Sequence, residues 1–353
     1  MESNTQTIHR TRKKSEIAEP RSQEASGECS NFLAECQIGV NDMRLLKDML
    51  KNDLKYLKNR LLRSPSESDI CGVDDQTKPL VCSIDEAPSF QTSNKYITNG
   101  YRTSKSKERC IKGILQWTNE TVNIWTHLGP LIVLIFRYSE DVLLNYDAAK
   151  FEPFDRKLSS FMLLCYSMML GLSSVYHIFN CCCCKCFRYW YGWDFVGVSL
   201  SIYAYGTGFL FLQFRGSPFW IIFYGTIKTI IAGVPIGMVF STKYFDKKYD
   251  DSRSVWIGGF VLFNIIPTVH SILLRGGLED PVVKATLPPH LVVMFLLVGS
   301  FVIYANQFPE RYVPGRVDYV GNSHQIWHVG TATAVFFARH LYFQYILAFN
   351  GLT

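Results

Sequence analysis

The stretch Ser323-His324-Gln325-Ile326-Trp327-His328, near the C-terminus, places two imidazoles four residues apart where an apolar run begins. On a helix this spacing puts both rings on one face, roughly one turn apart, which suits a shared transition metal. Two histidines are too few for such a site. A third ligand must therefore come from another element, and the elements have to be located first.

The charges of the chain are unevenly distributed. Residues 1–117 hold 19 of the 36 Lys and Arg residues and 16 of the 30 Asp and Glu residues, while 48% of the 353 residues are hydrophobic. After residue 117 the chain is a succession of apolar segments with few charges. The net charge of +6 is then better explained by basic residues that flank membrane spans than by a nucleic-acid partner. The composition predicts a polytopic membrane protein that binds no nucleic acid.

Seven segments are long and apolar enough to cross a bilayer as helices, which takes roughly 20 residues each. With the N-terminus inside, thirteen Lys and Arg residues near the span ends face the cytosol and seven face the other side. The sequence therefore predicts an all-α membrane protein with seven transmembrane helices, a cytosolic N-terminus and a luminal or extracellular C-terminus. The predicted spans are 119–138, 158–180, 190–213, 217–241, 254–274, 286–305 and 324–347.

The N-terminal extension is predicted to stay in the cytosol, because its first 20 residues have several charges and no apolar signal core. Residues 1–90 are polar and predicted to be largely disordered. Within them, residues 41–63 repeat apolar side chains at three- and four-residue steps with lysines between, which predicts a basic amphipathic helix. Such a helix suits either a membrane surface or a partner helix. Residues 91–118 are predicted to form a juxtamembrane interfacial segment, and residues 119–348 the transmembrane domain.

The alternating direction of the helices predicts the depth of their polar residues. His177 ends span two, Asp194 begins span three, and His324 and His328 begin span seven, so all four are predicted at the cytosolic side. Ionisable residues within spans are costly and commonly mark functional sites. Three imidazoles with one open position would form a catalytic type of zinc site, in which the bound water becomes more acidic.

Two further residues have candidate roles at this site. Ser173 precedes His177 by four residues and would share its face, where it could hydrogen-bond the water or a substrate oxygen. Asp194 could act as a hydrogen-bond acceptor or general base toward the water. Taken singly, each of these residues also fits a structural role. His177 and His328 could be buried hydrogen-bonded rings, and Asp194 could be the partner of an arginine. His324 could lie at a helix N-terminus that Ser323 or Asn322 caps.

Two other features have no assigned role in the sequence. Lys228 lies in the middle of the fourth span, where burying a charge costs free energy, and the sequence does not indicate which residue pairs with it. The run Cys181–Cys186 is predicted in the inner loop after span two. Adjacent cysteines there suit lipid acylation better than a second metal site, because zinc sites usually separate their cysteine ligands.

The chain resembles the progestin and adipoQ receptor family over roughly residues 95–347, and four stretches carry the resemblance. The matching stretches are Asn119-Glu120-Thr121-Val122-Asn123-Ile124-Trp125-Thr126-His127-Leu128, Ser173-Ser174-Val175-Tyr176-His177, Asp194-Phe195-Val196-Gly197 and Ser323-His324-Gln325-Ile326-Trp327-His328. The resemblance implies a zinc ion held by His177, His324 and His328, with Asp194 and Ser173 near its water.

The resemblance favours a scaffold, the chemistry of the site favours a hydrolase, and a lipid receptor is a further alternative. A Golgi-resident branch of the family implies a scaffold in the Golgi membrane that regulates Raf and MAPK signalling and holds a cytosolic kinase, here through the N-terminal region. The adiponectin-receptor branch implies hydrolysis of a lipid amide such as ceramide, with a sphingolipid-like ligand. A receptor for a small lipid, at the Golgi or the plasma membrane, is the third function. A large protein ligand is not expected, because most outer loops are short beside a typical interface of roughly 800 Å² per partner.

Overall fold

The computed structural model describes residue 51 and residues 79–140, 152–239 and 249–350. The chain divides into two units, residues 1–63 and 64–353, and every helix and strand from residue 79 onward belongs to the second unit. The predicted amphipathic helix at 41–63 falls outside the described residues, apart from Lys51. Of the region 1–90 that was predicted to be largely disordered, the structure describes residue 51 and residues 79–90.

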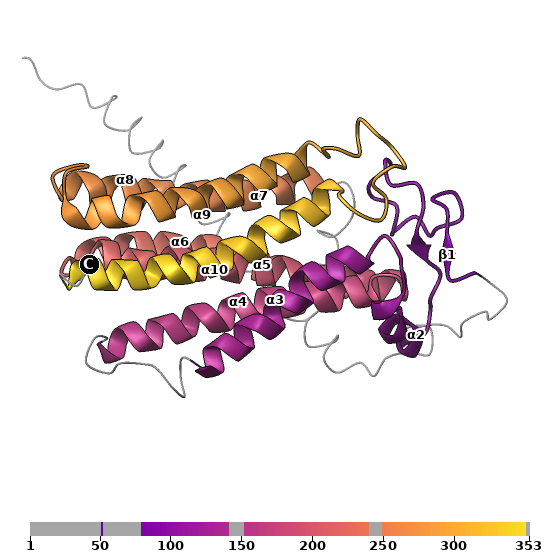
Figure 1. Ribbon diagram of the computed structural model, residues 1–353, viewed down its shortest axis with the longest axis horizontal. Helices are drawn as coiled ribbons and strands as arrows, with labels where there is room; N and C mark the ends of the chain where they lie inside the picture. Colours follow the sequence, from indigo (N-terminus) through magenta and orange to yellow (C-terminus); the bar gives the residue numbers. More distant parts are fainter. Residues whose placement is uncertain (1–50, 52–78, 141–151, 240–248, 351–353) are drawn as a thin grey trace, which may run out of the picture. The chain divides into compact units, whose positions relative to one another are not determined.

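The described part of the second unit contains seven helical rods that run in alternating directions (Figure 1). The fifth rod consists of two helices, α7 and α8, and each of the others is one helix. The rods are α3 (Thr121–Glu140), α4 (Pro153–Phe179), α5 (Cys184–Gln213), α6 (Pro218–Val239), α7 (Asp250–Phe263) with α8 (Ile265–Leu274), α9 (Pro281–Ala305) and α10 (Ser323–Phe349). The short elements β1 (Val81–Cys82), β2 (Tyr101–Arg102) and α2 (Lys107–Lys112) precede them, followed by a single 3₁₀ turn at Gly113–Leu115.

Five of these rods are long and apolar enough to cross a membrane. They are α4, α5, α6, the α7–α8 rod and α9, while α3 is a shorter apolar helix over Thr121–Arg137. With every rod helical, the chain is an all-α, multi-pass membrane protein. The helices also extend beyond several predicted spans, because α4, α5 and α9 each begin before the apolar stretch that defined the span. A helix longer than the hydrocarbon core continues into the polar interface.

Helix α10 has 27 residues but is not among the five apolar rods, because polar side chains interrupt its sequence. Several of these side chains are buried inside the bundle, including Gln325, His328 and Thr331. They therefore face other helices instead of lipid. α10 packs against α9, α3, α5 and α4, which explains how a helix of lower hydropathy is enclosed by the bundle.

Helices α9 and α10 approach each other closely at Gly330. A methyl group added there would lie 3.2 Å from the backbone carbonyl oxygen of Leu296 and would overlap the hydroxyl of Ser300. Small residues at such a crossing let helix backbones pack directly, which is a common way for helices to associate in membranes. This contact fixes α10, and with it the histidine pair at its N-terminal end, against α9.

The segment between α9 and α10 is tied to the chain that precedes α3. Glu310 accepts hydrogen bonds from the side-chain amide of Asn94 at 3.0 Å and from the backbone N–H of Ser323 at 2.8 Å. Asp318 accepts hydrogen bonds from the backbone N–H groups of Thr98 and Asn99. In Figure 1 both segments lie at the end of the bundle where α10 begins. Residues far apart in sequence therefore cover one end of the helices together.

The fifth predicted span, 254–274, is broken into α7 and α8 at Asn264. Pro267 explains the break, because proline lacks an N–H and its ring clashes with the carbonyl four residues earlier in a continuous helix. The Asn264 side chain accepts a hydrogen bond from the Lys228 ammonium at 2.8 Å and donates one to the carbonyl of Phe260 at 3.0 Å. The partner of the buried Lys228 is thus a neutral amide at a helix break.

Gly206 on α5 leaves the space that this contact needs, and we expect Gly206→Ala to destabilise the protein. The added methyl group would lie 2.0 Å from Asn264 Oδ1 and 2.3 Å from Lys228 Nζ. Relieving the clash would disturb a hydrogen bond of a buried ammonium, at a cost of about 1–3 kcal/mol. Thermal unfolding of the detergent-solubilised protein measures the effect. Gly233→Ala on α6 is the matched control, since nothing lies within 4 Å of the added atom; an equal loss in both variants would contradict the prediction.

Candidate metal centre

Three histidines from two helices meet at the end of the bundle where α4 ends and α10 begins. His177, His324 and His328 each offer a ligand nitrogen, and these atoms all lie within 4.8 Å of one another. His177 and His328 are each only 2% exposed. The prediction that the three imidazoles converge is confirmed, and this group is able to bind a metal ion.

The distances within the group suit a small tetrahedral ion. His324 Nε2 and His177 Nε2 are 3.3 Å apart. Two nitrogens that bind one zinc ion at about 2.05 Å with tetrahedral angles are separated by about 3.3 Å. The ring centroids are 5.1 Å apart for His177 and His324, and 4.6 Å apart for His324 and His328. The donor set is therefore compatible with zinc.

Hydrogen bonds to the other ring nitrogens fix the tautomers of two of these histidines. His177 Nδ1 lies 2.7 Å from Glu120 Oε2, and His328 Nδ1 lies 3.1 Å from the carbonyl oxygen of Asn123. A carboxylate and a carbonyl can only accept, so each Nδ1 carries the proton. The Nε2 lone pairs are then left for a metal, which is the arrangement that metal-binding histidines commonly have.

Glu120 is the centre of a polar network that orients His177. Its carboxylate also accepts hydrogen bonds from Asn123 Nδ2 at 2.8 Å and from Asn180 Nδ2 at 2.7 Å. Arg102 Nη2 donates to Asn180 Oδ1 at 2.8 Å and to the carbonyl oxygen of His177. Residues before α3 and at the end of α4 thus hold the imidazole in place.

His127 lies against the cluster without joining it. Its ring stacks on that of His328 with centroids 3.8 Å apart and planes 2° from parallel, and its Nε2 is 3.3 Å from Thr331 Oγ1. The metal-ligating group found among the described residues does not include it. The structure thus gives His127 a stacking contact that limits the orientation of the His328 ring.

Ser173 and Asp194 lie next to each other. Ser173 is 1% exposed and hydrogen-bonds to the Asp194 carboxylate, which is close enough to His177 for their charges to interact. Within the described ranges, Asp194 Oδ1 is buried and has no hydrogen-bond partner. A buried acceptor without a partner is costly, and such atoms often bind water or another ligand.

Glu120, Asn123 and Arg102 are functional candidates that the sequence did not single out. Glu120 and Asn123 belong to the stretch that resembles the receptor family, and a carboxylate where a span begins is a signal that could have identified Glu120. Arg102 lies 75 positions before His177, and the sequence has no local signal for that contact.

We expect Glu120→Gln to weaken metal binding by roughly 10–100-fold, the usual effect of losing a partner of a metal-bound histidine. The amide keeps the shape of the side chain but loses the charge that favours a protonated His177 Nδ1. Competition with a chelator, using full-length protein in detergent, measures the affinity. Glu108→Gln is the control, because the Glu108 side chain on α2 is 79% exposed and pairs with Lys112. Equal affinity in all three proteins would show that Glu120 does not support the site.

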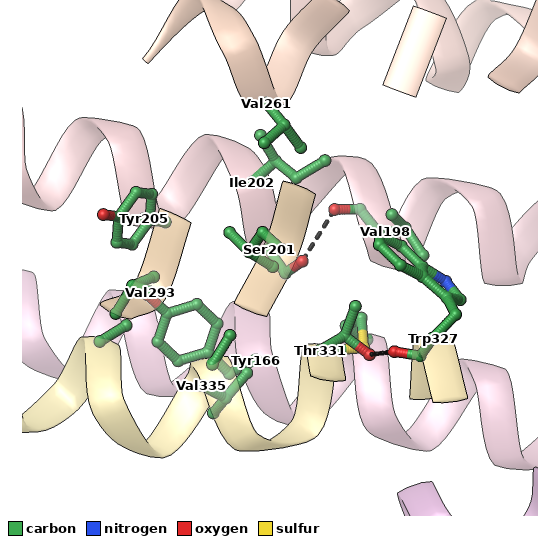
Figure 2. Close-up of a pocket in the computed structure, with 14 residues that line it drawn as sticks. Tyr166, Val198, Ser201, Ile202, Tyr205, Val261, Val293, Trp327, Thr331 and Val335 are labelled. Carbon is green, nitrogen blue, oxygen red and sulfur yellow. Dashed lines mark hydrogen bonds between the residues drawn. The ribbon is translucent and has the colours of Figure 1, made fainter. Parts of the chain in front are cut away.

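A narrow apolar cavity lies beside the centre, between α4, α5, α7, α9 and α10 (Figure 2). Trp327 and Thr331 of α10 line it, and they flank His328 in the sequence. The hydroxyls of Ser201 and Thr331 are bonded to backbone carbonyls of their own helices, at 2.8 Å and 3.1 Å. The cavity has a volume of about 30 Å³, which leaves room for little more than one water molecule.

A larger groove lies between α9, α10 and the first turn of α3. Its volume is about 450 Å³, and its walls are almost entirely apolar. Ile326 and Val329 of α10 form one wall, Phe295 and Ile303 of α9 form another, and Val122 closes one side. The groove therefore runs along the same first turns of α10 that carry His324 and His328.

Comparison with known proteins gives a family match over much of the chain. Residues 115–339 match the family model described as "Haemolysin-III related". The chain is 29% identical over 255 residues to human Progestin and adipoQ receptor family member 3, covering 70% of this chain and 80% of that protein. It is 30% identical over 253 residues to Heptahelical transmembrane protein 1 of Arabidopsis thaliana, covering 69% of this chain and 74% of that protein. It is 24% identical over 264 residues to the Adiponectin receptor protein of Drosophila melanogaster, covering 74% of this chain and 58% of that protein. With a family match over more than half its length and a buried group of three histidines, this chain belongs to the haemolysin-III related family of progestin and adipoQ receptors.

Proposed function

We propose that this protein is a zinc-dependent hydrolase of lipid amides that works within the membrane. The observation that carries the proposal is the convergence of His177, His324 and His328, with the Nδ1 atoms of His177 and His328 held by protein acceptors. A zinc ion with three histidine ligands keeps a fourth position for water and makes that water more acidic. Three ligands with one open position are typical of catalytic zinc sites, whereas structural sites use four protein ligands.

The side chains around the histidines have roles in this proposal. Asp194 accepts a proton from the attacking water through its unpartnered Oδ1, and the hydroxyl of Ser173 holds the carboxylate in position. The same aspartate then returns the proton to the departing amine. Glu120 keeps the imidazole of His177 oriented through the hydrogen bond at Nδ1.

A lipid is the substrate class that suits the surroundings of the site. The α9–α10 groove has the volume and the apolar walls that an acyl chain needs, and it runs beside the turns that carry two of the ligands. A sphingolipid such as ceramide has an amide next to a polar head and two hydrocarbon chains. In this proposal one chain lies in the groove while the amide reaches the histidine end of the bundle.

The proposal also includes an orientation in the membrane. The excess of Lys and Arg residues at the histidine end supports a cytosolic position for that end and for the N-terminus. The C-terminus is then luminal or extracellular. The resemblance to the Golgi-resident branch supports a Golgi membrane location, and the plasma membrane is the alternative.

Metal analysis and a lipid-hydrolysis assay on one preparation test the hydrolase. Full-length protein in lipid nanodiscs should contain about one zinc ion per chain and release fatty acid from ceramide. Addition of a chelator should stop the release, and zinc should restore it. Protein that holds zinc stoichiometrically but releases no fatty acid from ceramide or other N-acyl lipids would exclude the hydrolase.

The second candidate is a scaffold that holds a cytosolic Raf-type kinase and regulates MAPK signalling. It is supported by the 29% identity to Progestin and adipoQ receptor family member 3 and by the long, charged N-terminal region. A zinc-free variant that retains the kinase at the Golgi, together with loss of the kinase when residues 1–90 are removed, would favour the scaffold. A receptor for a small lipid would use the same groove and would bind the lipid without cleaving it.

A further inference from the structure

Two cysteines from different elements lie together beside the metal centre. Cys110 is on α2, and Cys181 is two residues beyond the end of α4. Their sulfur atoms are 3.5 Å apart and share a hydrogen bond, and both residues carry thiols. Cys110 is 0% exposed and Cys181 3% exposed. Cys181 is therefore enclosed by the protein, which does not suit the lipid acylation considered for its sequence run.

The pair lies in an apolar cluster that joins α2 to the bundle. Ile124 of α3 and Ile178 of α4 belong to the same cluster. Such packing brings the two sulfurs together while keeping bulk water away from them. Since the metal-ligating group found among the described residues contains only histidines, the pair is not part of a cysteine metal site there.

Charge near the pair favours the thiolate of Cys181. The hydrogen bond with Cys110 lowers the pKa of Cys181, and the Arg102 guanidinium also lowers it, although burial and the Glu120 carboxylate oppose them. Within the described residues, Arg102 Nε and Nη1 are buried and have no hydrogen-bond partner, so part of this cation is not neutralised by direct contacts. A thiolate is the form of cysteine that reacts with oxidants.

We propose that Cys110 and Cys181 are a redox modification site that a peroxide converts to a reversible disulfide. The Cys181 thiolate attacks one peroxide oxygen, so that the O–O bond breaks, a sulfenic acid forms and one water molecule leaves after protonation. The Cys110 sulfur then attacks the sulfenic sulfur, the S–S bond forms, and the S–O bond breaks to release a second water. Overall, two thiols are oxidised to a disulfide and one hydrogen peroxide is reduced to two water molecules.

The geometry supports the approach of the sulfurs, and a local opening of α2 would admit the oxidant. A disulfide bond is about 2.05 Å long, so the sulfurs at 3.5 Å have to move together by about 1.5 Å. Helix α2 has only six residues, and helices of that length depend on their packing for stability. Local opening of such a segment would admit a small peroxide without unfolding the bundle. The disulfide would then tie α2 covalently to the segment that comes after His177.

Peptide mapping of oxidised protein tests the site directly. Full-length protein in lipid nanodiscs is treated with hydrogen peroxide, blocked with N-ethylmaleimide, unfolded, digested and analysed by mass spectrometry. We expect a cross-linked species that joins the peptide of Cys110 to the peptide of Cys181, in most chains, and its complete loss after dithiothreitol. Accessibility of Cys110 to N-ethylmaleimide in the unfolded state should fall by the same fraction.

Two serine variants assign the cross-link. Cys181→Ser should abolish it, whereas Cys184→Ser, which changes a half-buried cysteine outside the pair, should retain it. A cross-link that persists in Cys181→Ser would overturn the assignment. So would a wild-type protein whose Cys110 stays fully reactive after unfolding at every peroxide dose. Because this last measurement uses the unmodified chain, it remains decisive even if a variant fails to fold.

Discussion

Replacing His328 with alanine should remove most of the bound zinc. His328 contributes one of three nitrogens that lie within 4.8 Å of one another, and two imidazoles with water do not hold zinc tightly enough to survive purification. Its ring is also buried between the ring of His127 and the backbone of Asn123. We expect the metal content to fall from about one zinc ion per chain to a small fraction of that value. Elemental analysis of full-length protein after gel filtration measures it.

The matched control is His270→Ala, because His270 belongs to α8 and bonds to the hydroxyl of Tyr224 at 3.1 Å, outside the three-histidine group. This variant should keep its zinc. Both proteins should elute as folded monodisperse species, which separates metal loss from misfolding. If folded His328→Ala protein still contains one zinc ion per chain, the three histidines do not form the metal site.

Much of the helical architecture could be predicted, because lipid imposes strong rules on a chain. Apolar runs of sufficient length must form helices, and their order determines which ends share a side of the membrane. The break at Asn264 was missed, since a proline in an apolar run is compatible with either a kink or two helices. The partner of Lys228 was missed as well, because Asn264 lies 36 positions away and meets it only through the packing of α6 against the helix break.

The site was predictable to the extent that it depends on helix direction. Alternation placed His177 and His324 at one end of the bundle, and their Nε2 atoms are indeed 3.3 Å apart. The residues that orient them could not be ranked from the sequence. Glu120 precedes α3 and Arg102 belongs to β2, and neither follows a helical period that would indicate the direction of its side chain. Their contacts depend on how the segment before α3 packs against the end of α4.

Replacing Asp194 with asparagine should reduce lipid-amide hydrolysis by roughly 10²–10⁴-fold, the range expected when a general base is lost. Asparagine keeps the size of the side chain and can still bond to Ser173, but it cannot take a proton from water. Zinc content should stay at the wild-type level, because Asp194 is not one of the three grouped ligands. The measurements are fatty-acid release from ceramide in nanodiscs and elemental analysis of the same samples.

Asp280→Asn is the matched control, since the Asp280 side chain caps α9 by accepting from the backbone N–H of Val283 at 3.0 Å, and asparagine caps helices equally well. This variant should hydrolyse ceramide at the wild-type rate. Three outcomes are distinguishable. Loss of both zinc and activity in Asp194→Asn would assign Asp194 to metal retention, and full activity with zinc present would remove it from the chemistry. Loss of activity alone is the result that a proton acceptor beside the metal requires.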